Sequence, residues 1–272
     1  MKRFYLVAVF ACAASGPALA ELPADPLKSS MWTILAKRYF SEAPVVFDER
    51  VKIVVPSITE NQAQVPVAAD ARAVPGVTKM IVFADLNPIQ HVLTLTPQNA
   101  APYISFRMKV EQATPVRAAA LTEDGVWHVG GVFLEAAGGG CTANAMARND
   151  TDWADTLGQT QGKTWRELDG TTRARIRIKH PMDTGLAKDN TPSYHIETLN
   201  LHGSSGEPLA IVETFEPVSE DPTMTLMLHV PPSDASIEID GLDNNGGTYR
   251  SSLPVPGRQS STPSPETSAG LG

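Results

Sequence analysis

An alternation of apolar and polar side chains runs through the stretch Tyr103-Ile104-Ser105-Phe106-Arg107-Met108-Lys109-Val110. Successive side chains of an extended chain point to opposite sides, so the four apolar residues from Ile104 to Val110 share one face. This period of two predicts a β-strand with one face in a core and the other in solvent.

The same kind of pattern continues on both sides of this stretch, between residues 45 and 135. Turn signals separate the apolar runs, among them Asn87-Pro88 and Glu123-Asp124-Gly125. Short strands at this spacing are typical of a β-sandwich, here of about seven strands. The further strands that we expect are 51–55, 65–67, 77–83, 92–95, 116–121 and 126–133.

A second β-rich region covers residues 173–253. Its first strand, Arg173 to Lys179, alternates basic and aliphatic side chains, which indicates one charged face and one buried face. The other strands that we expect are 194–201, 208–215, 223–230, 236–240 and 248–250. The sequence therefore predicts an all-β protein with two β-sandwich domains, the second smaller than the first.

The ends of the chain show three different patterns. Residues 1–20 have a basic start, an apolar run too short to cross a membrane, and the small-residue site Ala18-Leu19-Ala20, which together predict a signal peptide cleaved after Ala20. Residues 21–40 are expected to form a helix, with Asp25-Pro26 at its start and Leu27, Met31, Ile34 and Leu35 on one face. Residues 254–272 are rich in Ser, Pro, Thr and Gly, and we expect a disordered tail.

The predicted leader and the charge of the chain limit the class of protein. A cleaved leader without a second long apolar segment predicts an exported, periplasmic protein that has no membrane span. The formal net charge of −8 argues against nucleic acid and anionic membranes as partners.

Cysteine content points to Cys141. The other cysteine, Cys12, lies in the predicted leader, so the mature chain keeps one thiol in a compartment where cysteines are normally paired. A single remaining cysteine suggests intermolecular pairing or a reactive thiol. The preceding glycines, Gly138, Gly139 and Gly140, favour a mobile arm over a packed core element. We therefore expect residues 138–172 to be an interdomain linker that bears the cysteine.

Other kinds of site receive less support. Six histidines are present, but none follows Cys141 at a spacing that suits a copper site, so we expect neither a metal nor another cofactor. A cysteine hydrolase needs a rigidly held nucleophile, and a glycine arm does not provide one. A covalent carrier has the opposite requirement, because its nucleophile must move between active sites. We expect a carrier and not an enzyme.

Several motifs of the first half resemble the SoxY family of sulfur carriers. They are Gly76-Val77, Asn87-Pro88, Ile104-Ser105-Phe106-Arg107-Met108-Lys109, Thr114-Pro115-Val116-Arg117 and Gly139-Gly140-Cys141. The second half is similar to SoxZ, the partner of SoxY. Its motifs are His180-Pro181-Met182-Asp183-Thr184-Gly185, Phe215 and Asp243-Asn244-Asn245-Gly246-Gly247. The chain resembles a fusion of the two, with a SoxY-like domain at 21–137 and a SoxZ-like domain at 173–253.

This resemblance implies a fold and a function. Both domains would be immunoglobulin-like sandwiches, and Cys141 would carry sulfur intermediates of sulfur-compound oxidation, such as thiosulfate oxidation. Gly138, Gly139 and Gly140 would form the carrier arm, and His180 is a candidate contact of the bound group. The partners would be periplasmic sulfur-oxidation enzymes or c-type cytochromes. Fused forms are associated with quinoprotein dehydrogenase systems.

The sequence departs from the family in one respect. In SoxY the cysteine lies near a free chain end, whereas here Thr142 and about thirty linker residues follow it, so the arm is a tethered loop. Two other functions stay open. The protein could be an accessory protein of a periplasmic quinoprotein dehydrogenase that dimerises through a Cys141 disulfide, or a thiol enzyme.

Overall fold

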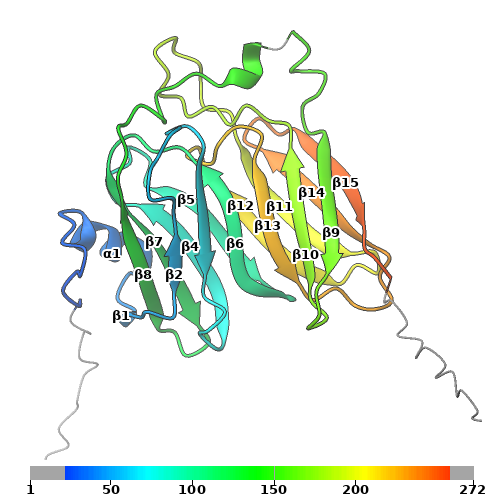
Figure 1. The fold of residues 1–272 in the computed structure, drawn as a ribbon, viewed down its shortest axis with the longest axis horizontal. Coiled ribbons are helices and arrows are strands. Elements are labelled where there is room, and N and C mark those ends of the chain that lie inside the picture. Colours follow the sequence, from blue (N-terminus) through cyan, green and yellow to red (C-terminus); the bar gives the residue numbers. More distant parts are fainter. Residues whose placement is uncertain (1–21, 150, 258–272) are drawn as a thin grey trace, which may run out of the picture.

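The computed structural model describes residues 22–149 and 151–257. The first half of the chain begins with one short helix, α1 (Trp32–Phe40), and continues with eight strands (Figure 1). These strands are β1 (Val45–Phe47), β2 (Lys52–Val54), β3 (Val65–Asp70), β4 (Val77–Ala84), β5 (His91–Pro97), β6 (Ala100–Met108), β7 (Thr114–Thr122) and β8 (Trp127–Leu134). The opening alternation of the sequence is β6, in which Ile104, Phe106 and Met108 are buried and Arg107 is exposed.

The second half begins after a long connection that contains a 3₁₀ turn, η1 (Met146–Asn149). In Figure 1 this connection passes over one end of the sandwich before it reaches β9. The strands that follow are β9 (Thr160–Arg166), β10 (Thr172–Ile178), β11 (Ile196–Gly203), β12 (Pro208–Thr214), β13 (Thr223–Leu228), β14 (Ser236–Asp243) and β15 (Thr248–Pro254).

The strands form two sheets, and both sheets run through the two halves of the chain. The nine-stranded sheet has the order β1-β8-β7-β4-β5-β12-β11-β14-β15, and the six-stranded sheet has the order β2-β3-β6-β13-β10-β9. Antiparallel pairing of β5 with β12 and of β6 with β13 joins the halves. The prediction of two β-sandwiches is confirmed, and the structure adds that they are continuous with each other.

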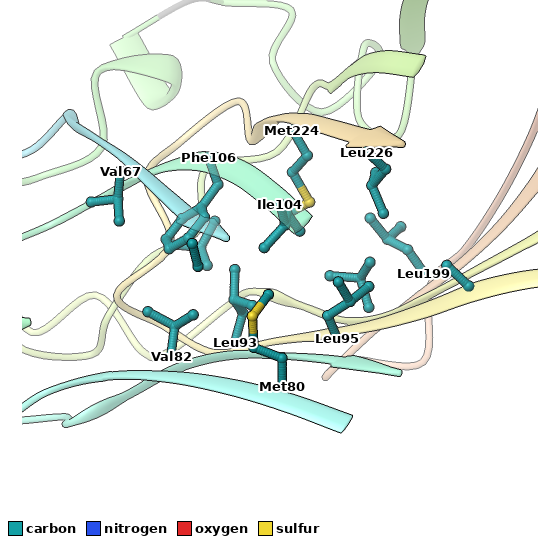
Figure 2. Packing of buried hydrophobic residues seen from close by; sticks show 14 of the residues in the cluster. Val67, Met80, Val82, Leu93, Leu95, Ile104, Phe106, Leu199, Met224 and Leu226 are labelled. Carbon is teal, nitrogen blue, oxygen red and sulfur yellow. The ribbon is translucent and has the colours of Figure 1, made fainter. Parts of the chain in front are cut away.

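The two sheets enclose one hydrophobic core. Figure 2 shows side chains of both halves meeting in it: Val82 and Leu95 from the first half lie in the nine-stranded sheet with Leu199 from the second, opposite Phe106 and Leu226 of the six-stranded sheet. All five are 3% exposed or less. A core that crosses the domain boundary holds the halves in a fixed relation, because separating them would expose apolar surface to water.

The prediction that residues 138–172 form a linker is wrong for the part from Thr160 onward. Residues Thr160–Arg166 form β9, which pairs with the whole of β10 and therefore belongs to the second sandwich. The sequence pattern does not predict this strand, because β9 lies at the edge of its sheet and has no alternation of apolar and polar residues. Most of its side chains are polar, and only Thr164 is buried.

The N-terminal helix exists but is shorter than the predicted 21–40. Asp25 does not cap it, since α1 begins at Trp32. The Asp25 carboxylate instead accepts hydrogen bonds from the backbone of Leu27 and Ser29 in a turn before the helix and pairs with the buried Arg117 at 2.7 Å. The residues of α1 that are buried are Trp32, Leu35, Ala36 and Phe40. They pack on the outer face of the nine-stranded sheet, whereas Ile34, predicted on the buried side, is 59% exposed.

Predictions for the two ends of the chain cannot be compared with the structure in full. The signal peptide at 1–20 and most of the predicted tail at 254–272 lie outside the described residues, although Val255 is packed in the core. Within residues 22–149 and 151–257, no helix has the length and apolar character that crossing a membrane requires.

Candidate functional site

The glycine run that precedes Cys141 lies against the ends of strands of the first half. Gly139 and Gly140 donate backbone hydrogen bonds to the carbonyls of Glu111 at 3.2 Å and Val110 at 3.0 Å. A Cβ atom on Gly140 would lie 2.1 Å from the carbonyl oxygen of Gln62, so only glycine fits there. Gly138 has a φ of +104°, which favours glycine for a conformational reason. The run therefore seats the loop closely on the domain.

Cys141 is held by its backbone from both halves of the chain. The Glu111 carboxylate accepts hydrogen bonds from the backbone N–H of Cys141 at 3.0 Å and of Thr142 at 3.1 Å, and from the Thr142 hydroxyl at 3.1 Å. On the other side, the Thr184 hydroxyl donates to the Cys141 carbonyl at 2.6 Å. Glu111 follows β6 of the first half and Thr184 precedes β11 of the second, so the loop is fastened where the halves meet.

The thiol itself is buried, with a residue exposure of 0%. This corrects the expectation of an exposed thiol on a mobile arm. Burial raises the pKa of Cys141 to about 12, the nearby Lys109 ammonium lowers it, and the Glu111 carboxylate raises it. In the docked loop Cys141 is therefore a neutral thiol near neutral pH and a poor nucleophile, since the thiolate is the reactive form.

Lys109 is a buried cation beside this thiol. Its ammonium donates hydrogen bonds to the backbone carbonyls of Met182, Glu216 and Val218, the last two at 3.2 Å. Lys109 belongs to the first half and all three acceptors belong to the second, so this side chain ties the halves together. Burial lowers the pKa of Lys109 to about 8, while the charge of a Cys141 thiolate would raise it.

The chain beyond Cys141 is fastened a second time by Arg148. Its guanidinium binds the buried carboxylate of Asp183, with Nε at 2.8 Å, and lies over the Trp153 ring at 4.5 Å from its centroid. The loop that carries Cys141 is thus held at Glu111, at Thr184 and at Asp183.

His180, the predicted contact of a bound group, lies in the interior of the second half. It is 1% exposed, its Nδ1 accepts a hydrogen bond from the Met182 backbone at 3.0 Å, and its ring packs 4.5 Å from the Tyr194 ring. Nε2 is buried without a hydrogen-bond partner in the described part of the chain. Burial lowers the pKa of His180 to about 3, so the ring is neutral. Contact with an adduct on Cys141 stays a prediction.

Sequence reasoning missed the residues that hold the loop. Lys109 and Thr184 stand in the motifs that carry the family resemblance, but nothing local indicates that they meet at Cys141. Glu111 was not recognised as a candidate. The signal that could have drawn attention to it is an acidic side chain just beyond the end of the predicted strand 103–110, where a buried strand gives way to a loop.

Two protein-family models match the chain in tandem. The model of sulfur oxidation protein SoxY matches residues 36–141, and that of sulphur oxidation protein SoxZ matches residues 151–254. Together they cover about three quarters of the chain. The SoxZ match begins ahead of β9, in agreement with the placement of that strand in the second sandwich.

Among solved structures, the chain is similar to the sulfur carrier protein SoxY from Chlorobium limicola f thiosulfatophilum. The two are 22% identical, the match covers 39% of this chain and 92% of the other, and the TM-score is 0.35. No curated protein sequence matches the chain.

Proposed function

Because the chain belongs to the SoxY and SoxZ families of sulfur-oxidation proteins, as a fusion of one domain of each, we propose that it is a covalent carrier of sulfur intermediates on Cys141. The carried group would be bound through a sulfur–sulfur bond to the Cys141 Sγ atom. The protein would present this group to other proteins and would not itself catalyse the oxidation.

The observation that carries the proposal is that the SoxY match ends on Cys141 itself. Cys141 is also the one free cysteine among the described residues. A carrier needs a single attachment point, because a second thiol nearby would release the bound group by forming a disulfide. The loop is held by side chains of both domains, which is consistent with a function that requires the two together.

Because the thiol is buried, the proposed carrier would work through two positions of its loop. In the docked position Cys141 is shielded and protonated, which protects it from unspecific oxidation. Loading requires the loop to leave its seat, since no partner can reach an atom in a residue that is 0% exposed. Outside the seat the thiol regains an ordinary pKa near ~8.5 and a useful thiolate fraction.

An oxidation can load the sulfur group onto Cys141. When the Cys141 thiol joins the sulfur atom of an anionic sulfur compound such as thiosulfate, one S–S bond forms, and the thiol proton and two electrons leave. We propose that c-type cytochromes of the periplasm accept these electrons. Periplasmic sulfur-oxidation enzymes would then act on the bound group, and a quinoprotein dehydrogenase system is a further candidate partner. The predicted signal peptide supports this location.

Intact-mass measurement tests the proposal. The protein is purified from the periplasm of cells grown on a reduced sulfur compound, and a second sample is treated with tetrathionate, which transfers a sulfane-sulfonate group to a thiolate and releases thiosulfate. We expect sulfur or sulfonate adducts that disappear on reduction and are absent from Cys141→Ala. Finding only the free thiol in both samples would contradict the proposal.

The same samples distinguish the other functions. A reducible dimer with no adduct would indicate a protein that dimerises through Cys141. Turnover of a sulfur compound by the isolated protein would indicate a thiol enzyme.

A further inference from the structure

The outer face of the six-stranded sheet carries a groove that spans both halves of the chain. It has a volume of about 600 Å³. Its floor is made of small side chains in adjacent strands, in a row in which Ala68 of β3 lies opposite Ser105 of β6, and Ser105 opposite Thr225 of β13. Small residues at the junction of the halves leave a trough between larger side chains on each side.

One wall of the groove is cationic and aromatic. Arg175 of β10 lies opposite Thr225 on one side and Lys163 of β9 on the other, so Arg175 borders the floor and Lys163 lies one strand beyond it on the same face. Trp165 lines the same wall, with the Arg173 guanidinium 4.3 Å from its ring centroid.

Three cations around the groove have no acidic partner within residues 22–149 and 151–257. Arg173 is neutralised by Glu167 at 2.7 Å, but Arg107, Arg175 and Lys163 form no ion pair within the described residues. All three are exposed. Unpaired positive charge concentrated on one face of a chain whose net charge is −8 is complementary to an acidic surface.

The opposite wall is apolar. It is lined by Val54, Val55, Pro56 and Pro66. Val54 of the edge strand β2 is 60% exposed. Such exposure is notable, because edge strands commonly carry charged side chains that prevent pairing with other chains. A ligand that fills the groove must therefore offer carboxylates to one wall and apolar groups to the other.

We propose that this groove binds an extended acidic segment of a partner protein, with carboxylates on one side of the segment and aliphatic side chains on the other. An extended chain presents its side chains alternately to two sides, which matches two walls of different character. Nucleic acid offers phosphates and bases that can stack on Trp165, but it has few aliphatic groups for the valine and proline wall, and the net charge of −8 opposes its approach. The chain's own residues 258–272 contain one arginine and one glutamate and supply no net negative charge.

The position of the groove relates it to the carrier loop. Arg107 is followed two residues later by Lys109, and Val110 accepts the hydrogen bond from Gly140. Because a strand rises ~3.3 Å per residue, the Arg107 end of the groove lies about 10 Å along the chain from the seat of the glycine run. A partner held in the groove would stand beside Cys141. This role in sulfur transfer rests on the proposed function, whereas the binding itself does not.

Fluorescence anisotropy with a labelled peptide of alternating glutamate and valine tests the binding. We expect saturable, salt-sensitive binding with a Kd below about 1 mM, the weak end of specific recognition. Lys163→Glu and Arg175→Glu should each weaken it about tenfold or more, because like charges would then face each other. Lys79→Glu is the matched control, since Lys79 on β4 of the other sheet is exposed and forms no ion pair with any residue that the structure describes.

Further probes decide between the proposal and simpler explanations. A glutamine–valine peptide should bind more weakly, because it lacks the negative charges. A glutamate–serine peptide should also bind more weakly, because it cannot make the contacts with the apolar wall. No saturable binding, equal binding to the glutamate–serine peptide or to a single-stranded oligonucleotide, or equal weakening by Lys79→Glu would overturn the proposal. Cys141→Ala should bind the peptide like the wild type, so a failure of the carrier function leaves this result unaffected.

Discussion

Replacing Glu111 by alanine should release the Cys141 loop from its seat. The carboxylate accepts three hydrogen bonds from Cys141 and Thr142 in the docked loop. Hydrogen bonds to charged groups contribute about 1.5–3 kcal/mol each, and water recovers part of that when it reaches the freed donors. We therefore expect docking to weaken by about 2–4 kcal/mol, which corresponds to a roughly 30- to 1000-fold larger undocked fraction.

The rate of alkylation of Cys141 by iodoacetamide measures this fraction, because only an undocked thiol is accessible. We expect the rate near neutral pH to rise by about 30-fold or more in Glu111→Ala, up to the rate of a free thiol. Glu135→Ala is the control, since Glu135 is an exposed glutamate just beyond β8 whose carboxylate makes no hydrogen bond to the loop among the described residues. Urea unfolding of each variant separates loop release from loss of the fold.

The pH dependence separates two effects of the substitution. Removing the negative charge of Glu111 also lowers the pKa of the docked thiol, and that effect alone would shift the rate profile while the thiol stays buried. Undocking instead brings the profile to the ordinary thiol pKa near ~8.5. A Glu111→Ala rate within about twofold of the wild type and of Glu135→Ala would show that these hydrogen bonds do not hold the loop.

Three further perturbations have expected outcomes. Gly140→Ala should raise the alkylation rate more than Gly139→Ala, because a Cβ on residue 140 would collide with the Gln62 carbonyl, whereas one on residue 139 meets nothing within 4 Å and adds only the strain of a φ of +86°. Lys109→Met should lower the free energy of unfolding in urea by about 1–3 kcal/mol, since buried carbonyls of the second half lose their donor, and Lys79→Met should leave it unchanged. The wild type should lose stability as pH falls from 6.5 towards 3, because the unfolded chain protonates His180 in that range and the folded chain, with a pKa of about 3, does not. His180→Asn, which keeps an acceptor for the Met182 N–H, should show a smaller loss, and an identical acid profile would contradict this assignment.

Local sequence patterns predicted most of the strands. The pairing of the two halves and the burial of Cys141 depend on contacts between residues far apart in the sequence, which these patterns do not report. The alternation at 103–110 and the hairpin around Glu123-Asp124-Gly125 appear in the structure because a period of two is set within a few residues. The pairing of β5 with β12 joins residues more than a hundred positions apart, and no periodicity reports it. The burial of Cys141 is of the same kind, since it depends on how closely Gly140 approaches Gln62.

The chain that continues after Cys141 restricts both the reach of the loop and the kind of site that it can enter. Cys141 lies seven residues after Leu134, the end of β8, and Arg148, which is bound to Asp183, lies seven residues further on. At ~3.3–3.6 Å per residue, either segment spans at most about 25 Å. With Arg148 in place, the two tethers have equal lengths, so Cys141 can reach only points that lie within about 25 Å of both anchors, a smaller region than a free chain end would reach. In the proposed carrier function, two segments of chain would also have to enter a partner's active site side by side. The fusion thus favours partners with an open cleft, which a segment bound in the groove beside Arg107 could align with the loop.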